Sequence, residues 1–293
     1  MALINITSFA LPPISSLISL RYYYRISFFI MYVIYKNLAY ASPQLYFARE
    51  NRYSAATLFE SLYLQGFNLL FTALPIICYG VMEQNYPKEK LLDEPELYRN
   101  ISRNKYMRIP VFLGWCALAY FHSLIYFYLP HGAALVAGGG VLDEYGGALL
   151  SGWDFGVLVI TISVIVINFK LYVLTKYWTR FTHIVYWGTM LAFLLFSLIY
   201  SAMPRSAPVY RSFLQTFSLP MTWLILFVTF VACIIPDVVI QIIITLVEKR
   251  RAVEQVQRRS AWDDFQSASS STPLMRSKAK IGNNNMTEMQ TIS

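Results

Sequence analysis

The sequence predicts an all-α integral membrane protein, built as a six-helix transmembrane bundle. Hydrophobic residues make up 56% of the chain and charged residues only 14%, whereas charged residues are about 25% of an average soluble domain. Six apolar runs are each long enough to cross the ~30 Å hydrocarbon core of a bilayer as a helix. The runs cover residues 26–46, 61–82, 109–130, 155–175, 183–203 and 221–243.

The distribution of positive charge follows the expected membrane topology. The net charge is +8, and Lys and Arg gather before residue 26, in the 83–108 loop, in the 170–182 region and after residue 243. The intervening loops hold few of them. Because cytoplasmic loops carry the excess of Lys and Arg, both termini are predicted to be cytosolic. Basic and aromatic residues are not interleaved as in a nucleic-acid interface, so we predict no nucleic-acid partner.

Three segments follow from this pattern. Residues 1–20 are an apolar N-terminal lead without a basic start, so we expect an interfacial segment instead of a cleaved signal peptide. Residues 21–251 form the six-span transmembrane domain. Residues 252–293 begin with a basic, helix-like stretch and turn polar, and their composition predicts a disordered cytosolic tail.

The first functional candidate is Lys36, which lies near the middle of the 26–46 run beside Asn37. A lysine at the bilayer midplane costs about 2.5–3.5 kcal/mol on insertion scales. Lys36 should therefore face the interior of the bundle or a wet cavity. The alternatives are that it pairs with a neighbouring helix or that its ammonium reaches an interface along its own alkyl chain.

The next run, 61–82, contains Asn68, Thr72 and Pro75. Proline has no N–H and clashes with the carbonyl four residues earlier, so Pro75 predicts a kink or a partial unwinding that frees the carbonyl of Phe71. Broken membrane helices are tolerated where they line a cavity. We expect these residues and Lys36 to form one polar pathway, although Pro75 alone would also fit a role in packing.

Four polar residues lie in the later runs. His122 is expected to be a hydrogen-bonded packing residue. Asn168 and Lys170 are expected at the inner membrane interface, where Lys170 could reach headgroups. Asp237 is expected in a salt bridge or at a wet interface. We predict no metal site and no catalytic residue in the chain.

Several stretches resemble one protein family. RYYYRISFFIMYVIYKN and SLYLQGFNLLFTALPIICYGVMEQN look like the fifth and sixth transmembrane segments of the type IV P-type ATPases, the phospholipid flippases. INFKLYVLTKYWTRFTHIVYWGT resembles that family's segments eight and nine, and TWLILFVTFVACIIP resembles segment ten. The resemblance runs from about residue 21 to residue 251, and it implies that the six spans match segments five to ten of such an ATPase.

The resemblance implies part of an ATP-driven translocator that moves phospholipid from the outer to the cytosolic leaflet. By position, Lys36, Asn37 and Asn68 would lie on the lipid path, together with Thr72 and Pro75. The residues themselves suit this role, because Lys36, Asn37 and Asn68 supply hydrogen-bond donors to a phosphate diester. The first two runs contain no Asp or Glu, so cation transport, which needs carboxylates there, is disfavoured.

The sequence also departs from the family. It contains no Asp-Lys-Thr-Gly-Thr phosphorylation motif and no Gly-rich phosphate loop. The chain is therefore expected to be the C-terminal membrane half of a flippase, as a fragment, a truncated sequence or a half-protein, and not to hydrolyse ATP alone. ATP and Mg²⁺ are implied for the full-length family protein, with no cofactor in this chain.

The expected partners are phospholipid, the membrane, the missing ATPase domains and an accessory subunit. The expected location is the plasma membrane, the Golgi or endosomes. The alternative function is a six-span channel-like or scaffolding membrane protein without ATPase activity. No run has the regularly spaced Arg or Lys of a voltage sensor, and none has a carbonyl filter motif.

Overall fold

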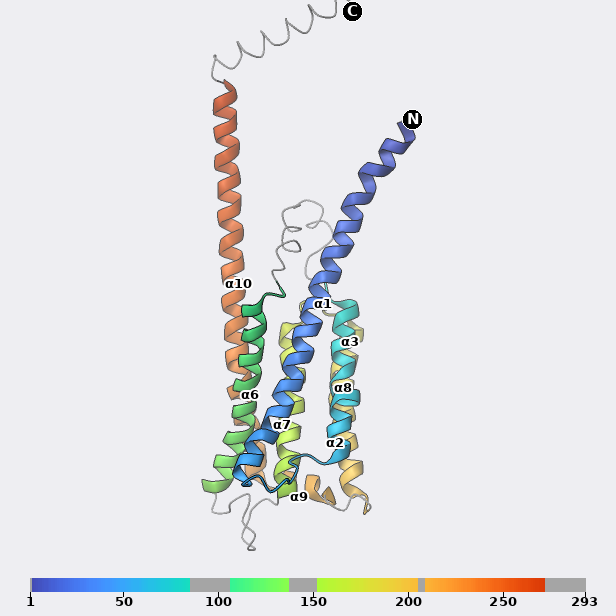
Figure 1. The fold of residues 1–293 in the computed structure, drawn as a ribbon, viewed down its shortest axis with the longest axis vertical. Coiled ribbons are helices and arrows are strands. Elements are labelled where there is room, and N and C mark those ends of the chain that lie inside the picture. Colours follow the sequence, from blue (N-terminus) through green and yellow to red (C-terminus); the bar gives the residue numbers. More distant parts are fainter. Residues whose placement is uncertain (1, 85–105, 137–151, 205–208, 272–293) are drawn as a thin grey trace, which may run out of the picture. The chain divides into compact units, whose positions relative to one another are not determined.

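The computed structural model of the protein describes residues 2–84, 106–136, 152–204 and 209–271. Helices account for nearly all of these ranges, and no strand occurs within them, which confirms the all-α prediction (Figure 1). Parts of two predicted loops, 85–105 and 137–151, and the polar end of the predicted tail, 272–293, lie outside the described residues. In chain order the elements are α1 (Ala2–Glu50), α2 (Ser61–Gly66), the π-helix η1 (Phe67–Phe71), α3 (Ala73–Met82), α6 (Ile109–Val136), α7 (Gly152–Leu174), α8 (Arg180–Ala202), α9 (Ser212–Ser218) and α10 (Pro220–Ser271).

Five helical segments of the described chain are long and apolar enough to cross a membrane, and they overlap five of the six predicted runs. They are Ser61–Met82, Ile109–Leu135, Gly152–Leu174, Arg180–Ala202 and Pro220–Arg251. The remaining run, 26–46, lies within α1, where Lys36, Asn37 and several Ser and Tyr side chains lower the mean hydropathy. α1 still packs along α6 and buries Tyr32 and Tyr35 completely. It is therefore an integral helix of the bundle.

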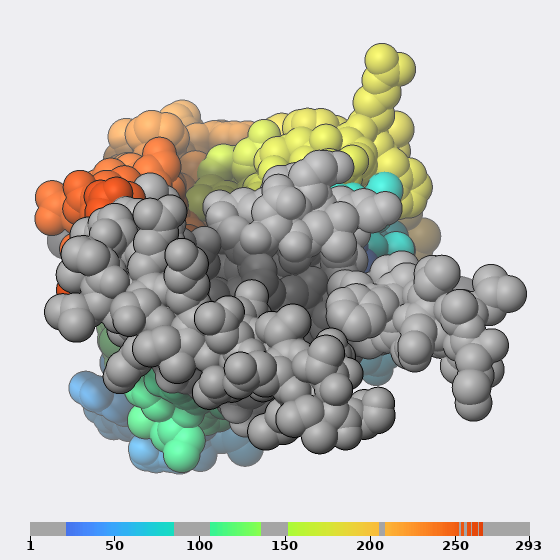
Figure 2. All heavy atoms as spheres, turned by 90° about the horizontal axis from the view of Figure 1, so that it is seen from above, coloured from blue at the N-terminus to red at the C-terminus, as the bar shows by residue number. Residues whose placement is uncertain are grey.

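α7 is the most deeply buried of the five spanning segments. It contacts α1, α3, α6, α8 and α9 and lies among them (Figure 1). Seen along the bundle, α8 and α6 lie on opposite sides of the molecule (Figure 2). The side chains of α7 are apolar on nearly all faces, a pattern typical of a helix surrounded by others. Any polar side chain on α7 must therefore find its partners inside the protein.

Two helices extend beyond the predicted spans. α1 begins at Ala2, so the predicted lead and the first run form one continuous helix. α10 continues to Ser271, past the predicted start of the tail at residue 252, because the stretch after Glu248 is rich in Ala, Glu, Gln and Arg, which favour helix. The chain forms one compact unit up to Asp237 and a second from Val238 onward. All contacts described below lie within the first unit.

Candidate functional site

The second predicted span is a broken helix. α2 ends at Gly66, η1 covers one π-helical turn, and α3 begins at Ala73. Thr72, between η1 and α3, has φ −136° and ψ −8°, which are not helical values. Pro75 cannot donate a hydrogen bond to the carbonyl of Phe71, four residues earlier. The predicted interruption is confirmed, and it lies one turn before Pro75.

Lys36 projects from α1 to this interruption. Its ammonium donates a hydrogen bond to Thr72 Oγ1 at 2.9 Å, and the Thr72 hydroxyl donates to the carbonyl of Phe67 at 2.7 Å. Lys36 is 5% exposed and Thr72 is fully buried. Within the part of the chain that the structure describes, no carboxylate lies within ion-pair distance of Lys36. A buried ammonium with one neutral acceptor retains donors and charge for an anionic group.

The five predicted site residues divide into two groups. Lys36, Thr72 and Pro75 are buried together at the break. Asn37 and Asn68 are exposed on the surface of the described chain. Asn37 follows Lys36 directly, and successive residues on a helix point in directions about 100° apart, so the two side chains leave α1 on different faces. Asn68 lies within η1, one turn before Thr72.

Asn168 completes the break from α7, and sequence reasoning missed this role. Its Nδ2 donates to the carbonyl of Phe71 at 2.9 Å and to the carbonyl of Val164, on its own helix, at 2.9 Å. Asn168 is 1% exposed, so its predicted place at the membrane interface was wrong. A signal was present, because an amide in an apolar run must find partners inside the protein.

Lys170 is also buried, and its predicted interfacial position was wrong for the same reason. Its ammonium donates to Asp237 Oδ1, on α10, at 2.6 Å. It also lies 4.5 Å from the ring centre of Tyr35 and 5.6 Å from that of Trp115, within the range of cation–π contacts. The salt bridge predicted for Asp237 is confirmed.

His122 connects this ion pair to α1. The hydroxyl of Tyr35 is hydrogen-bonded to His122 Nδ1 at 2.5 Å, which confirms the prediction of a hydrogen-bonded packing residue. His122 Nε2 lies 3.7 Å from Asp237 Oδ1. Because Tyr35 and Lys36 are adjacent, α1 takes part in two polar networks, one with α6, α7 and α10 and one with the broken helix.

Glu83 closes the end of the broken helix outside the spanning segment. Its carboxylate accepts backbone N–H groups of Lys176 at 3.2 Å and Tyr177 at 3.4 Å, and its carbonyl accepts Arg25 Nε at 2.6 Å. Burial raises the pKa of Glu83, and these two N–H groups, with the charges of Lys176 and Arg25, offset part of that rise. Glu83 thus ties α1 and the α7–α8 connection to α3.

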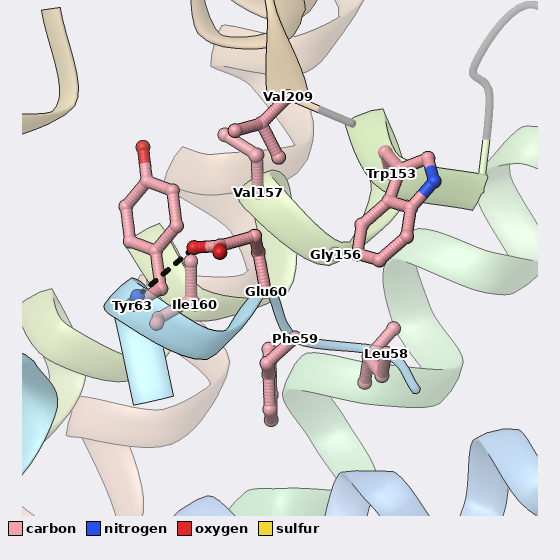
Figure 3. Close-up of a pocket in the computed structure, with 9 residues that line it drawn as sticks. All are labelled: Leu58, Phe59, Glu60, Tyr63, Trp153, Gly156, Val157, Ile160 and Val209. Carbon is pink, nitrogen blue, oxygen red and sulfur yellow. Dashed lines mark hydrogen bonds between the residues drawn. The ribbon is translucent and has the colours of Figure 1, made fainter. Parts of the chain in front are cut away.

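A narrow crevice lies at the other end of the bundle (Figure 3). It has about 180 Å³ of empty space, part of it open to the outside, and is lined by Leu58, Phe59, Glu60, Tyr63, Trp153, Gly156, Val157, Ile160 and Val209. Its carboxylate, Glu60, accepts the backbone N–H groups of Leu62 and Tyr63 and so caps α2. A Cβ at Gly156 would overlap the carbonyl oxygen of Leu58. The crevice is therefore a close contact between α7 and the chain before α2, and its acid has a structural role.

The fold and the break define the class of protein. It is a multi-pass α-helical membrane protein in which an interrupted helix meets a buried lysine that lacks a carboxylate partner among the described residues. Such interrupted helices are typical of membrane transporters, where they line substrate sites.

The chain belongs to the phospholipid-translocating P-type ATPases, as a C-terminal region of that family. The family model "Phospholipid-translocating P-type ATPase C-terminal" matches residues 21–250. The chain is 32% identical over 243 residues to human phospholipid-transporting ATPase IH, covering 82% of the chain and 21% of the relative. It is 30% identical over 258 residues to human phospholipid-transporting ATPase IG, covering 87% and 22%. It is 32% identical over 219 residues to phospholipid-transporting ATPase DRS2 of Saccharomyces cerevisiae, covering 73% and 16%.

The chain thus spans about a fifth of the length of these relatives. This membership supports the first of the two functions expected from the sequence and disfavours a channel or scaffold. It leaves the lipid-path roles of individual residues as predictions.

Proposed function

We propose that this chain forms part of the lipid path of an ATP-driven phospholipid translocase, which moves phospholipid from the outer to the cytosolic leaflet. Two findings support the proposal. The chain belongs to a family whose relatives are named phospholipid-transporting ATPases. Its second span is also interrupted at a position that meets a buried ammonium.

The contact between Lys36 and Thr72 carries the proposal. Thr72 Oγ1 is a neutral acceptor, and it satisfies one of the three donors of the Lys36 ammonium. A phosphate diester supplies negatively charged oxygens, and hydrogen bonds between charged groups are roughly twice as strong as neutral ones. A passing headgroup phosphate can therefore compete with Thr72 for Lys36, and Thr72 holds the ammonium when no lipid is present.

The other predicted residues have distinct proposed roles. Pro75 maintains the interruption by withholding an N–H from the carbonyl of Phe71. Asn37 and Asn68, on the exposed surface of the described chain, offer amide donors to polar headgroup atoms outside the buried Lys36–Thr72 contact. The path thus has a buried cationic part and an outer amide part.

The energy source is proposed to lie in the rest of the complete protein. Among the described residues, no three or more His, Cys, Asp or Glu side chains form a group that could hold a metal ion. The residues of this chain therefore do not fit Mg²⁺ or a nucleotide, and we assign ATP and Mg²⁺ to the phosphorylation and nucleotide-binding domains. We further propose an accessory subunit, cytosolic termini, and residence in the plasma membrane, the Golgi or endosomes.

Replacing Lys36 tests the proposal in the complete protein that joins this chain to those domains. Uptake of a fluorescent phospholipid into cells or vesicles is measured for the wild type and for Lys36→Met. Hydrogen bonds to charged groups contribute about 1.5–3 kcal/mol, so uptake efficiency should fall on the order of 10- to 100-fold.

The matched control is Lys249→Met, the same change at an exposed lysine, which should leave uptake unchanged. Phosphorylation by ATP should persist in both variants. Unchanged lipid uptake by Lys36→Met would remove Lys36 from the path.

A further inference from the structure

We infer that Asn168 of α7 is a positioning residue that fixes the broken helix so that Thr72 is presented to Lys36. The amide of Asn168 reaches across from α7 and donates to the carbonyl of Phe71 at 2.9 Å. This is the carbonyl that Pro75 leaves without a partner in α3. One side chain from another helix thus replaces the backbone bond that the proline removes.

The geometry of the peptide bond carries this effect to Thr72. The carbonyl of Phe71 and the amide of Thr72 belong to one rigid plane, because the peptide bond does not rotate freely. A donor held at the Phe71 oxygen therefore fixes the orientation of that plane and the direction in which the chain enters Thr72. The Thr72 hydroxyl, set in this way, donates to the carbonyl of Phe67 and accepts from Lys36 Nζ. Asn168 therefore acts on Lys36 through two links and does not touch it.

The chemistry of the amide fits this task closely. Nδ2 carries two N–H donors, and both are used, one on Phe71 and one on the Val164 carbonyl of α7. The second bond holds the side chain against its own helix and fixes its direction. A hydroxyl has one donor and an ionised carboxylate has none. Asparagine is therefore able to hold both carbonyls, where serine or aspartate is not.

A role in packing alone does not explain an amide at this position. Asn168 Oδ1 is buried and has no hydrogen-bond partner among the described residues. An unsatisfied buried acceptor costs free energy that a leucine would avoid. The amide is retained in a helix that is otherwise almost wholly apolar, which points to the use of its donors.

The importance of this residue for transport rests on the proposed function, in which Lys36 meets the lipid phosphate. The positioning itself can be tested without lipid transport. In the full 293-residue chain, reconstituted in lipid nanodiscs, acetic anhydride modifies lysine amines, and mass spectrometry follows the acetylation rate at each lysine. Lys36 should be slow in the wild type because it is buried and bonded to Thr72.

Asn168→Leu should raise the acetylation rate of Lys36 about tenfold, because a hydrogen bond to a charged group is lost. Thr72→Val, which removes the acceptor directly, should raise it similarly. Lys170 provides an internal control, since it is buried on the same helix but bonded to Asp237. Its rate should not change. Asn168→Asp, which removes the donors at nearly constant volume, gives the same test if the leucine variant does not fold.

Three results would overturn the inference. Lys36 could remain slow in both Asn168 variants, Lys36 and Lys170 could accelerate together, or Thr72→Val could leave Lys36 slow. The second result would mean that the whole bundle had loosened. Fluorescent lipid uptake by the complete protein provides the separate arm. A wild type that moves no phospholipid refutes the proposed function alone, and the selective exposure of Lys36 still supports the role of Asn168.

Discussion

Lys36 and Lys170 are both buried lysines in this bundle, but their partners differ. Lys170 donates to a carboxylate at 2.6 Å and lies near the faces of two aromatic rings. Lys36 donates to a hydroxyl at 2.9 Å, and the described residues place no carboxylate within ion-pair distance of it. The charge of Lys170 is therefore neutralised by its own chain, whereas that of Lys36 is available to an anion. A charge in a membrane helix is a functional candidate only when its partners leave it unsatisfied.

The largest expected effect comes from removing the partner that Lys170 has and Lys36 lacks. Asp237→Ala leaves a buried ammonium without its counter-charge, and breaking such a pair costs about 3–5 kcal/mol. Chemical denaturation of the detergent-solubilised chain measures the loss of unfolding free energy. Lys36→Met, the change used in the uptake test, should cost much less stability.

A double variant sharpens this test. Lys170→Met combined with Asp237→Leu removes both charges and should recover most of the stability, because apolar residues of similar volume often replace a buried pair without loss. If Asp237→Ala and Lys36→Met destabilise the chain equally, the distinction between the two lysines does not hold.

A change in α7 should affect both lysine sites, because this helix carries Asn168 and Lys170. In Gly156→Ala the new Cβ would overlap the backbone oxygen of Leu58, so α7 must shift. Overpacking of this kind costs about 1–3 kcal/mol. The same denaturation assay, with lysine acetylation, should show lower stability and faster labelling of both Lys36 and Lys170.

Gly188→Ala is the matched control for this prediction. A Cβ at Gly188 in α8 would meet nothing within 4 Å, so alanine should be neutral or stabilise the helix by up to about 1 kcal/mol. Equal destabilisation by the two alanines would argue against the contact between α7 and Leu58 as the cause.

The sequence was sufficient to predict the bundle and the break. Apolar runs longer than a bilayer is thick, with few charges, allow little except membrane helices. Pro75 within such a run necessarily leaves the carbonyl of Phe71 without its helical partner. The position of Lys36 at the middle of its run gave the expectation that it faces protein, and the structure places it there.

The partners of these groups were not predictable from the same information. Asn168 and Lys170 were assigned to the interface because they lie near the end of the 155–175 run. That reasoning used depth in the membrane and ignored rotation about the helix axis. A run that is apolar on all faces gives no moment from which the inner face can be read, yet the same uniformity indicates a helix surrounded by others. The Asn168–Phe71 contact joins residues 97 positions apart, which local patterns do not reveal.

Glu83 extends the comparison to a buried acid outside the spanning segments, where we expect the smallest effect. Burial raises its pKa above the ordinary value of 4.5, although backbone N–H groups and nearby cations offset part of the rise. Between 4.5 and the raised pKa, the folded chain binds more protons than the unfolded chain, so stability should fall as pH rises through that window. Thermal unfolding of the wild type and Glu83→Gln, followed from pH 4 upward, measures this dependence. The wild type should lose stability relative to Glu83→Gln as pH rises, because glutamine has no proton to release. Parallel curves for the two proteins would show that Glu83 is no more costly to ionise in the fold than in water, and that N–H donors and cations alone can fully compensate a buried carboxylate.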